Sequence, residues 1–137
     1  MRPRLIVLVL AGSLVAAACG GKSTAPTVTR ATVTQVGLAW GSGPTPCASA
    51  VTMTFTVQVL YGTVGDPVVV DFTGPGLPAT ITENLTSSSQ LITKQYPVAA
   101  VAAGNSATWT ALVISVAGQK PDTLPGGHSA AQSAVSC

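Results

Sequence analysis

The sequence predicts an all-β protein that folds as a single antiparallel β-sandwich of about seven or eight strands. Over 51–61 the residues alternate strictly, with Val51, Met53 and Phe55 in one phase and Thr52 and Thr54 in the other. β-Branched residues are abundant, and clusters of Gly, Pro, Ser and Thr separate the apolar runs. No segment carries the spacing of an amphipathic helix or of a parallel βαβ unit, so a sandwich is favoured over an α/β fold.

The first strand is expected within 28–40, where Val36, Leu38 and Trp40 alternate before the turn formers at 41–46. The alternating segment 51–61 predicts a strand with one core face and one solvent face. Gly- and Pro-containing turns then separate shorter apolar runs. Further strands are expected at 68–72, 79–85, 90–96, 108–117 and 129–137.

Three segments of the second half carry additional expectations. The strand at 108–117 is apolar in both phases of its second half, which predicts a central position in a sheet. The Ala-rich segment 97–106 is expected to be a connection with room for a short helical turn. The longest loop is expected at 118–128, which contains Pro121 and Pro125.

The chain begins with a targeting segment. Arg2 and Arg4 precede an apolar run over 5–18, which ends in three alanines directly before Cys19. This run is shorter than the roughly 20 residues that a membrane-spanning helix needs. A cleaved signal is therefore favoured over a permanent transmembrane anchor.

The segment 1–19 resembles the signal peptide and lipobox of bacterial lipoproteins, with Ala16 where that family more often has Leu. The resemblance implies a diacylglycerol on the sulfur of Cys19, often with a further acyl chain such as palmitate on the new amine. It divides the chain into a signal peptide at 1–18, a lipidated tether at 19–27 and a domain at 28–137. Because residue 20 is Gly and not Asp, it implies the outer membrane in a cell with two membranes. A plain secreted protein with a chance cysteine and an uncleaved anchor remain the alternatives.

The net charge of the mature chain and the spacing of its cations argue against a nucleic-acid partner. Once Arg2 and Arg4 leave with the signal, four Lys and Arg residues balance four Asp and Glu residues, and the net charge is zero. The four cations are scattered along the chain, whereas nucleic-acid binding needs clustered cations to displace counterions from phosphates. We therefore expect no nucleic-acid partner and no electrostatic footprint on anionic lipid.

With Cys19 lipidated, Cys47 and Cys137 remain as a pair in an oxidising compartment, where a disulfide persists. Such a bridge closes a loop of about 91 residues, for which chain entropy gives an upper contribution of roughly 4–5 kcal/mol. The alternative of a redox or metal-binding thiol pair lacks a CxxC motif or a neighbouring histidine.

The mature chain also resembles extracytoplasmic bacterial Ig-like domains. The resemblance rests on GPTPC at 43–47 before an alternating strand, on Trp109 in a late strand, and on SAVSC at 133–137. It implies an Ig-like sandwich. The two cysteines do not have the mid-strand spacing of antibody domains, so the resemblance implies no partner.

We find no residues that predict catalysis, a metal site or a cofactor. His128 is the only imidazole and lies beside two glycines, where an exposed loop residue is a better interpretation than a ligand. A Ser–His–Asp triad would need His128 with Asp122 in one proline-containing loop, and no nucleophile turn accompanies them. Trp40 and Trp109 are interpreted as core aromatics and not as ligand-stacking residues.

The candidate binding loop is 118–128, which carries Lys120, Asp122 and His128 at one end of the predicted sandwich. A simple long turn is the alternative. The sequence thus predicts a membrane-anchored, non-catalytic binding or structural module of the cell envelope, with an envelope protein or carbohydrate as candidate partner. The alternative function is an inhibitor of a secreted hydrolase or a small-ligand carrier that uses the end loops. A carrier should have a concave apolar pocket.

Overall fold

The computed structural model describes residues 30–123 and 130–137, without the side chains of Asp122 and Thr123. The predicted signal peptide 1–18, the lipidation site Cys19, the tether 19–27 and the loop residue His128 lie outside the described residues. Within the described ranges the chain forms strands and turns and no helix. The structure is thus all-β, as the sequence predicts.

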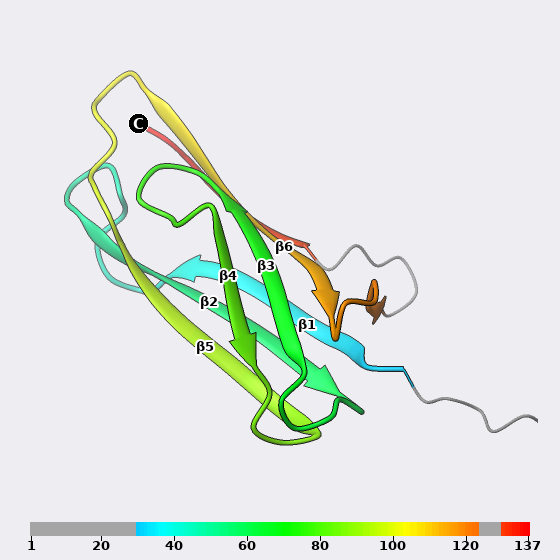
Figure 1. Cartoon of the computed structure of the whole chain (residues 1–137). Coiled ribbons are helices and arrows are strands. Elements are labelled where there is room, and N and C mark those ends of the chain that lie inside the picture. Colours follow the sequence, from blue (N-terminus) through cyan, green and yellow to red (C-terminus); the bar gives the residue numbers. More distant parts are fainter. Residues whose placement is uncertain (1–29, 124–129) are drawn as a thin grey trace, which may run out of the picture.

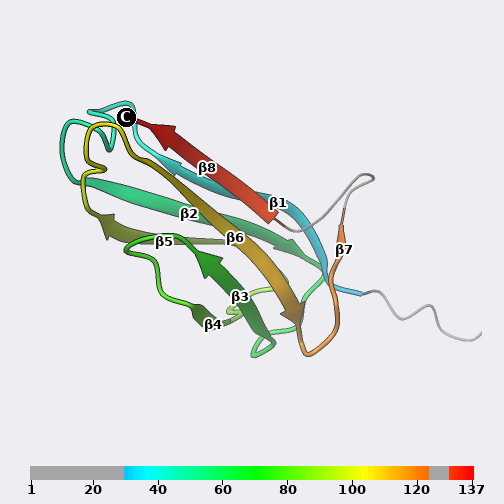
Figure 2. The ribbon, with the colours of Figure 1, turned by 90° about the horizontal axis from the view of Figure 1, so that it is seen from above.

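Two four-stranded sheets make up a β-sandwich (Figures 1 and 2). One sheet has the order β5-β2-β1-β7 and the other β4-β3-β6-β8. All strand pairs are antiparallel except β1 with β7, which are parallel. The strands are β1 (Thr32–Trp40), β2 (Val51–Leu60), β3 (Pro67–Thr73), β4 (Thr80–Asn84), β5 (Ser89–Val98), β6 (Ser106–Val116), β7 (Asp122–Thr123) and β8 (Ala130–Ser136).

The core lies between the inner faces of the two sheets. In β2 the inner phase of Met53, Phe55, Val57 and Val59 is fully buried, while the threonines of the other phase face outward. Phe55 meets Phe72 of the opposite sheet edge to face at 5.0 Å between ring centroids. Further buried members are Val33, Leu38, Val68, Val70, Leu85, Ile92, Val98, Trp109, Ala111, Val113 and Val116.

The long strand β6 lies between β3 and β8, which confirms its predicted central position. Its outer phase is nevertheless open, because Leu112 and Ile114 are each 40% exposed. Apolar residues in both phases of this segment therefore do not mean that both faces of the strand are buried.

Two predicted connections differ from the structure. β5 continues through Pro97 to Val98, and no helical turn follows before Ser106. Pro97 is tolerated because β5 is an edge strand, where a missing N–H leaves no ladder bond unmade. The predicted loop 118–128 contains the short strand β7, in which Asp122 pairs with Thr32 and Thr123 with Val33.

The sandwich has two ends with different connections. The disulfide end comprises 41–50, 74–79, 99–105 and Cys137. The entry end, where the chain enters β1, comprises Arg30 and the turns at 61–66, 85–88 and 117–121.

The disulfide end is closed by covalent, hydrogen-bonded and packing contacts. The Cys47–Cys137 disulfide joins the β1–β2 connection to the end of β8, with 5.4 Å between the Cα atoms. The amide of Val101 donates to the Pro46 carbonyl at 2.7 Å, and the amide of Cys137 donates to the Asn105 carbonyl at 2.8 Å. Both bonds hold the β5–β6 connection beside the disulfide.

Trp109 organises the other side of this end. Its ring is fully buried, meets Trp40 edge to face at 5.8 Å, and donates from Nε1 to the Pro75 carbonyl at 2.8 Å. Gly74, with φ +119°, passes so close that an added Cβ would lie 2.6 Å from Cδ1 of Trp109. The sequence-based interpretation of Trp109 as a core aromatic agrees with its place here.

Candidate functional site

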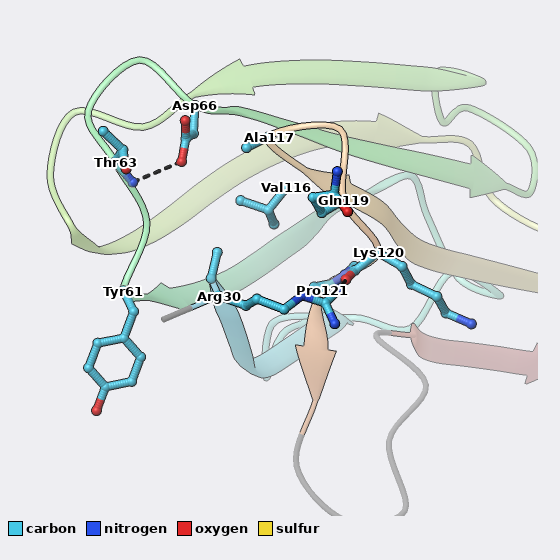
Figure 3. A pocket seen from close by; sticks show the side chains of 10 residues that line it. Arg30, Tyr61, Thr63, Asp66, Val116, Ala117, Gln119, Lys120 and Pro121 are labelled. Atoms are coloured by element: carbon cyan, nitrogen blue, oxygen red, sulfur yellow. Dashed lines mark hydrogen bonds between the residues drawn. The ribbon is translucent and has the colours of Figure 1, made fainter. Parts of the chain in front are cut away.

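The candidate site is a pocket of about 170 Å³ at the entry end (Figure 3). Three segments that are far apart in sequence line it: Arg30 and Ala31 before β1, three residues of the β2–β3 turn, and the β6–β7 turn. The residues of the β2–β3 turn are Tyr61, Thr63 and Asp66, and those of the β6–β7 turn are Val116, Ala117 and 119–121.

Backbone hydrogen bonds and one carboxylate fix the β2–β3 turn. Asp66 Oδ2 accepts from the Thr63 amide at 2.9 Å, and the Asp66 amide donates to the Thr63 carbonyl at 3.0 Å. Asp and Gly are favoured in such turns, since Asp bonds nearby amides and Gly adopts positive φ, here +93° at Gly65. The amide of Gly65 donates to the carbonyl of buried Leu85, which ties this turn to the next.

Tyr61 departs from the alternation that predicts a strand over 51–61. The strand ends at Leu60, Tyr61 has φ +59°, and its side chain is 63% exposed. In Figure 3 its ring points away from the body of the sandwich. The sequence placed Tyr61 in the inner phase, and the left-handed residue at the end of β2 moves its ring out of that phase instead.

The β6–β7 turn forms the opposite wall. Val116 and Gln119 exchange backbone hydrogen bonds at 2.9 and 3.0 Å, and Ala117 (φ +52°) donates its amide to the Pro67 carbonyl. The guanidinium of Arg30 donates to the Lys120 carbonyl. The start of β1 and the β6–β7 turn are therefore joined across the pocket.

The pocket combines an apolar floor with a charged rim. Buried Val116 and Pro121 contribute apolar surface, while Arg30 and Lys120 are exposed and Asp66 is half-buried. Among the described lining residues no hydroxyl is hydrogen-bonded to a base, as nucleophilic catalysis would need. What this arrangement can do chemically is hold a small ligand or a surface group that has an apolar part and a negative charge.

The structure places one of the three residues of the candidate binding loop at this pocket. Lys120 lies on the rim. Asp122 lies in β7, paired through its backbone with Thr32, and its side chain is outside the described residues, as is His128. The candidate binding loop as a set of three side chains therefore stays a prediction, because Lys120 alone has a described side chain.

Sequence reasoning missed Arg30, Tyr61 and Asp66 as pocket residues. In the sequence, Arg30 counts only as one of four scattered cations and Asp66 only as one of the four acidic residues that balance them. The available signal was topological: in an antiparallel sandwich, alternate connections lie at the same end, so the 61–66 and 117–121 turns belong beside the start of the first strand.

Two shallower depressions lie near Trp40. One lies along β1 and β2 over Gly37, Ala39, Thr54 and Thr56, and the other lies beside Gly43, Pro44 and Ala50. Neither is lined by a charged side chain. They offer hydroxyls and an aromatic edge but no group that would favour a charged ligand.

An ion pair connects the two sheets along one side of the sandwich. Lys94 of β5 and Glu83 of β4 form an ion pair at 2.7 Å between edge strands of different sheets. Nearby, burial raises the pKa of Tyr96 above 10.0, an effect that Lys94 opposes and Glu83 reinforces. These groups lie away from the pocket.

In residues 30–123 and 130–137 we find neither a group of three or more metal-ligating side chains nor a helix able to cross a bilayer.

Comparisons with protein-family models, with curated proteins and with solved structures found no match to this chain.

Proposed function

We propose that this chain is a lipid-anchored protein of the bacterial cell envelope whose single Ig-like sandwich acts as a non-catalytic binding or structural module. The pocket at the entry end carries the binding part of this proposal, since it places the predicted binding residue Lys120 on the rim of a concave surface. The charged run, apolar run and cysteine of segment 1–19 support the anchor.

The strand order supports the Ig-like assignment. Strands β1, β2 and β5 share one sheet and β3, β6 and β8 the other, as strands A, B and E and strands C, F and G do in Ig domains. The departure is β4, which pairs with β3 instead of joining β5. A further departure is the disulfide, which joins the β1–β2 connection to the residue after β8 and not the two sheets through mid-strand positions.

Lipidation of Cys19 has a direct test. Mass spectrometry of the mature protein from cells should find an N-terminal peptide that begins at Cys19 and carries diacylglycerol. The Cys19→Ser variant should lose this modification and leave the membrane fraction. A mature N-terminus at another residue would contradict the anchor.

Binding at the pocket is tested by photo-crosslinking in living cells with the anchor intact. A photoreactive amino acid replaces Lys120 at the rim, and the matched control carries it at exposed Ala102 of the disulfide end. A binding module gives one saturable product from position 120 and not from position 102. Scattered products in proportion to abundance from both positions would favour a structural role.

The pocket also favours a second candidate, a small-ligand carrier. A carrier needs a concave, mostly apolar site, and a volume of about 170 Å³ admits a small fragment and not a drug-sized molecule. Native mass spectrometry of protein purified from cells should then show a constant mass excess that disappears on denaturation. A mass equal to that of the lipidated chain would leave the module without a carried ligand.

A further inference from the structure

The entry end concentrates exposed apolar side chains in one turn. Val64 and Tyr61 are 67% and 63% exposed, which are the highest values among the large hydrophobic residues of the described ranges. They are three residues apart in the β2–β3 turn. Single exposed hydrophobic residues are ordinary, whereas two at the tip of one end form a small apolar protrusion.

Cations stand beside this protrusion. Exposed Lys120 and Arg30 lie on the same pocket as Tyr61, together with the carboxylate of Asp66. The connections of the disulfide end, at 41–50, 74–79 and 99–105, contain no Lys, Arg, Asp or Glu. The two ends therefore differ in both charge and exposed apolar surface.

The chain that leads to Cys19 leaves from the entry end. Ten residues, 20–29, lie between Cys19 and Arg30, and a flexible chain of that length would span on the order of 17 Å. A ten-residue strand such as β2 is ~33 Å long, so the disulfide end is too distant for that mean span. The hydrogen bond from Arg30 to the Lys120 carbonyl fixes the point of departure beside the pocket.

We infer that the entry end docks on the bilayer that holds the lipid of Cys19, with Tyr61 and Val64 entering the interfacial layer and Lys120 and Arg30 beside lipid phosphates. This inference rests on the proposed anchor and names the bilayer surface as the partner of the pocket. Tyr is suited to the interface because its ring is apolar and its hydroxyl is polar. Lys and Arg near the surface are attracted by anionic lipids. This departs from the sequence-based expectation of no electrostatic footprint on anionic lipid, because the fold brings two of the scattered cations, Arg30 and Lys120, to one end. The disulfide end then faces away from the membrane.

Hydroxyl-radical footprinting with mass spectrometry tests the inference. The lipidated mature chain is bound to vesicles of phosphatidylethanolamine and phosphatidylglycerol and compared with the Cys19→Ser chain in solution. Oxidation of Tyr61 and Val64 should slow by roughly tenfold on the vesicles, the change in docked population expected from burying one such side chain. Pro44 of the disulfide end and Leu112 on the outer face of β6 should oxidise at unchanged rates.

Variants separate docking from mere tethering. Val64→Ser should restore most of the oxidation of Tyr61 while the protein stays on the vesicles, and the matched Leu112→Ser should not. Replacing phosphatidylglycerol with phosphatidylcholine should weaken the protection of Tyr61. Equal oxidation of Tyr61 on vesicles and in solution, or protection of Pro44 instead, would overturn the inference.

The failure of the anchor is distinguishable from the failure of docking. If the protein from cells has no lipid on Cys19, the proposed anchor is wrong, and the same footprinting is carried out after coupling Cys19 to a maleimide lipid. Cys47 and Cys137 are joined in the disulfide, so Cys19 is the thiol that reacts. Unprotected Tyr61 in this coupled protein refutes docking whatever happens in cells.

Discussion

At the disulfide end, three connections and the last strand are held by a disulfide, two backbone hydrogen bonds and a buried tryptophan. The entry end holds its turns through backbone hydrogen bonds within and between turns, and it leaves Tyr61 and Val64 largely exposed. The same strands run between both ends, so the difference does not arise from the sheets. It shows that one sandwich can place its disulfide and its largest buried aromatic side chain at one end and its most exposed large apolar side chains at the other.

The largest expected effect comes from removing the disulfide. Cys47→Ala combined with Cys137→Ala should lower the free energy of unfolding by up to about 4–5 kcal/mol, because the bridge constrains a long loop of the unfolded chain. Denaturant unfolding with both proteins at the same pH measures the change. A loss below about 1 kcal/mol would mean that hydrogen bonds and Trp109 hold this end without the bridge.

Each end has a native glycine with positive φ, and replacing each of them by alanine compares how tightly the two ends are packed. Gly74→Ala should destabilise by about 3 kcal/mol, because φ +119° is strained for alanine and the new Cβ would meet Trp109 and the Thr108 carbonyl. Gly65→Ala at the entry end (φ +93°) has nothing within 4 Å of its Cβ, and backbone strain alone costs about 1–2 kcal/mol. Equal losses in thermal or denaturant unfolding would contradict the difference in packing.

Tyr96 gives a pH-dependent test near the disulfide end, where its ring meets Phe72 at 5.5 Å. Because burial raises its folded pKa above 10.0, the folded state holds its proton to higher pH than the unfolded state. The stability that Tyr96 contributes is thus fully present below pH 10.0 and is lost as pH rises through the folded pKa. Tyr96→Phe should change stability at pH 7 by less than about 1 kcal/mol and should flatten the decline above pH 10.0. An unchanged decline in denaturant unfolding would contradict this assignment.

The smallest expected effect belongs to the entry end. Val64→Ser in the unlipidated chain should change the free energy of unfolding by less than about 0.5 kcal/mol, since the side chain is 67% exposed. The measurement is denaturant unfolding in solution, without vesicles. A loss above about 1 kcal/mol would show that Val64 packs within the sandwich and is not a free surface group.

The strands that alternate strictly could be predicted closely from sequence. The expected strand 51–61 is β2 (Val51–Leu60), and the disulfide between Cys47 and Cys137 is present. Alternation and cysteine count are local or arithmetic signals, so they are readable without tertiary structure. The same local signal failed at Tyr61, because the strand ends at Leu60 and the backbone is left-handed at Tyr61, the last residue of the alternation.

The pocket could not be predicted in the same way. It depends on Arg30, Asp66 and Lys120 meeting from three segments, and β7 forms only because the start of β1 offers two residues for parallel pairing. A two-residue strand carries no periodicity of its own. Pairing with the distant start of β1 therefore makes a short strand in a segment whose local composition predicts a loop.

The position of the disulfide also determines how the protein responds to mechanical load. A pulling force applied between Cys19 and Cys137 would run along the chain to Cys47 and then cross the bridge directly to Cys137. Residues 48–136 would lie outside this covalent path. Of the strands, only β1 would carry the tension, loaded along its own length against its ladder with β2. Such a pull can extend only the residues before Cys47, so the bridge keeps the rest of the domain from being drawn out.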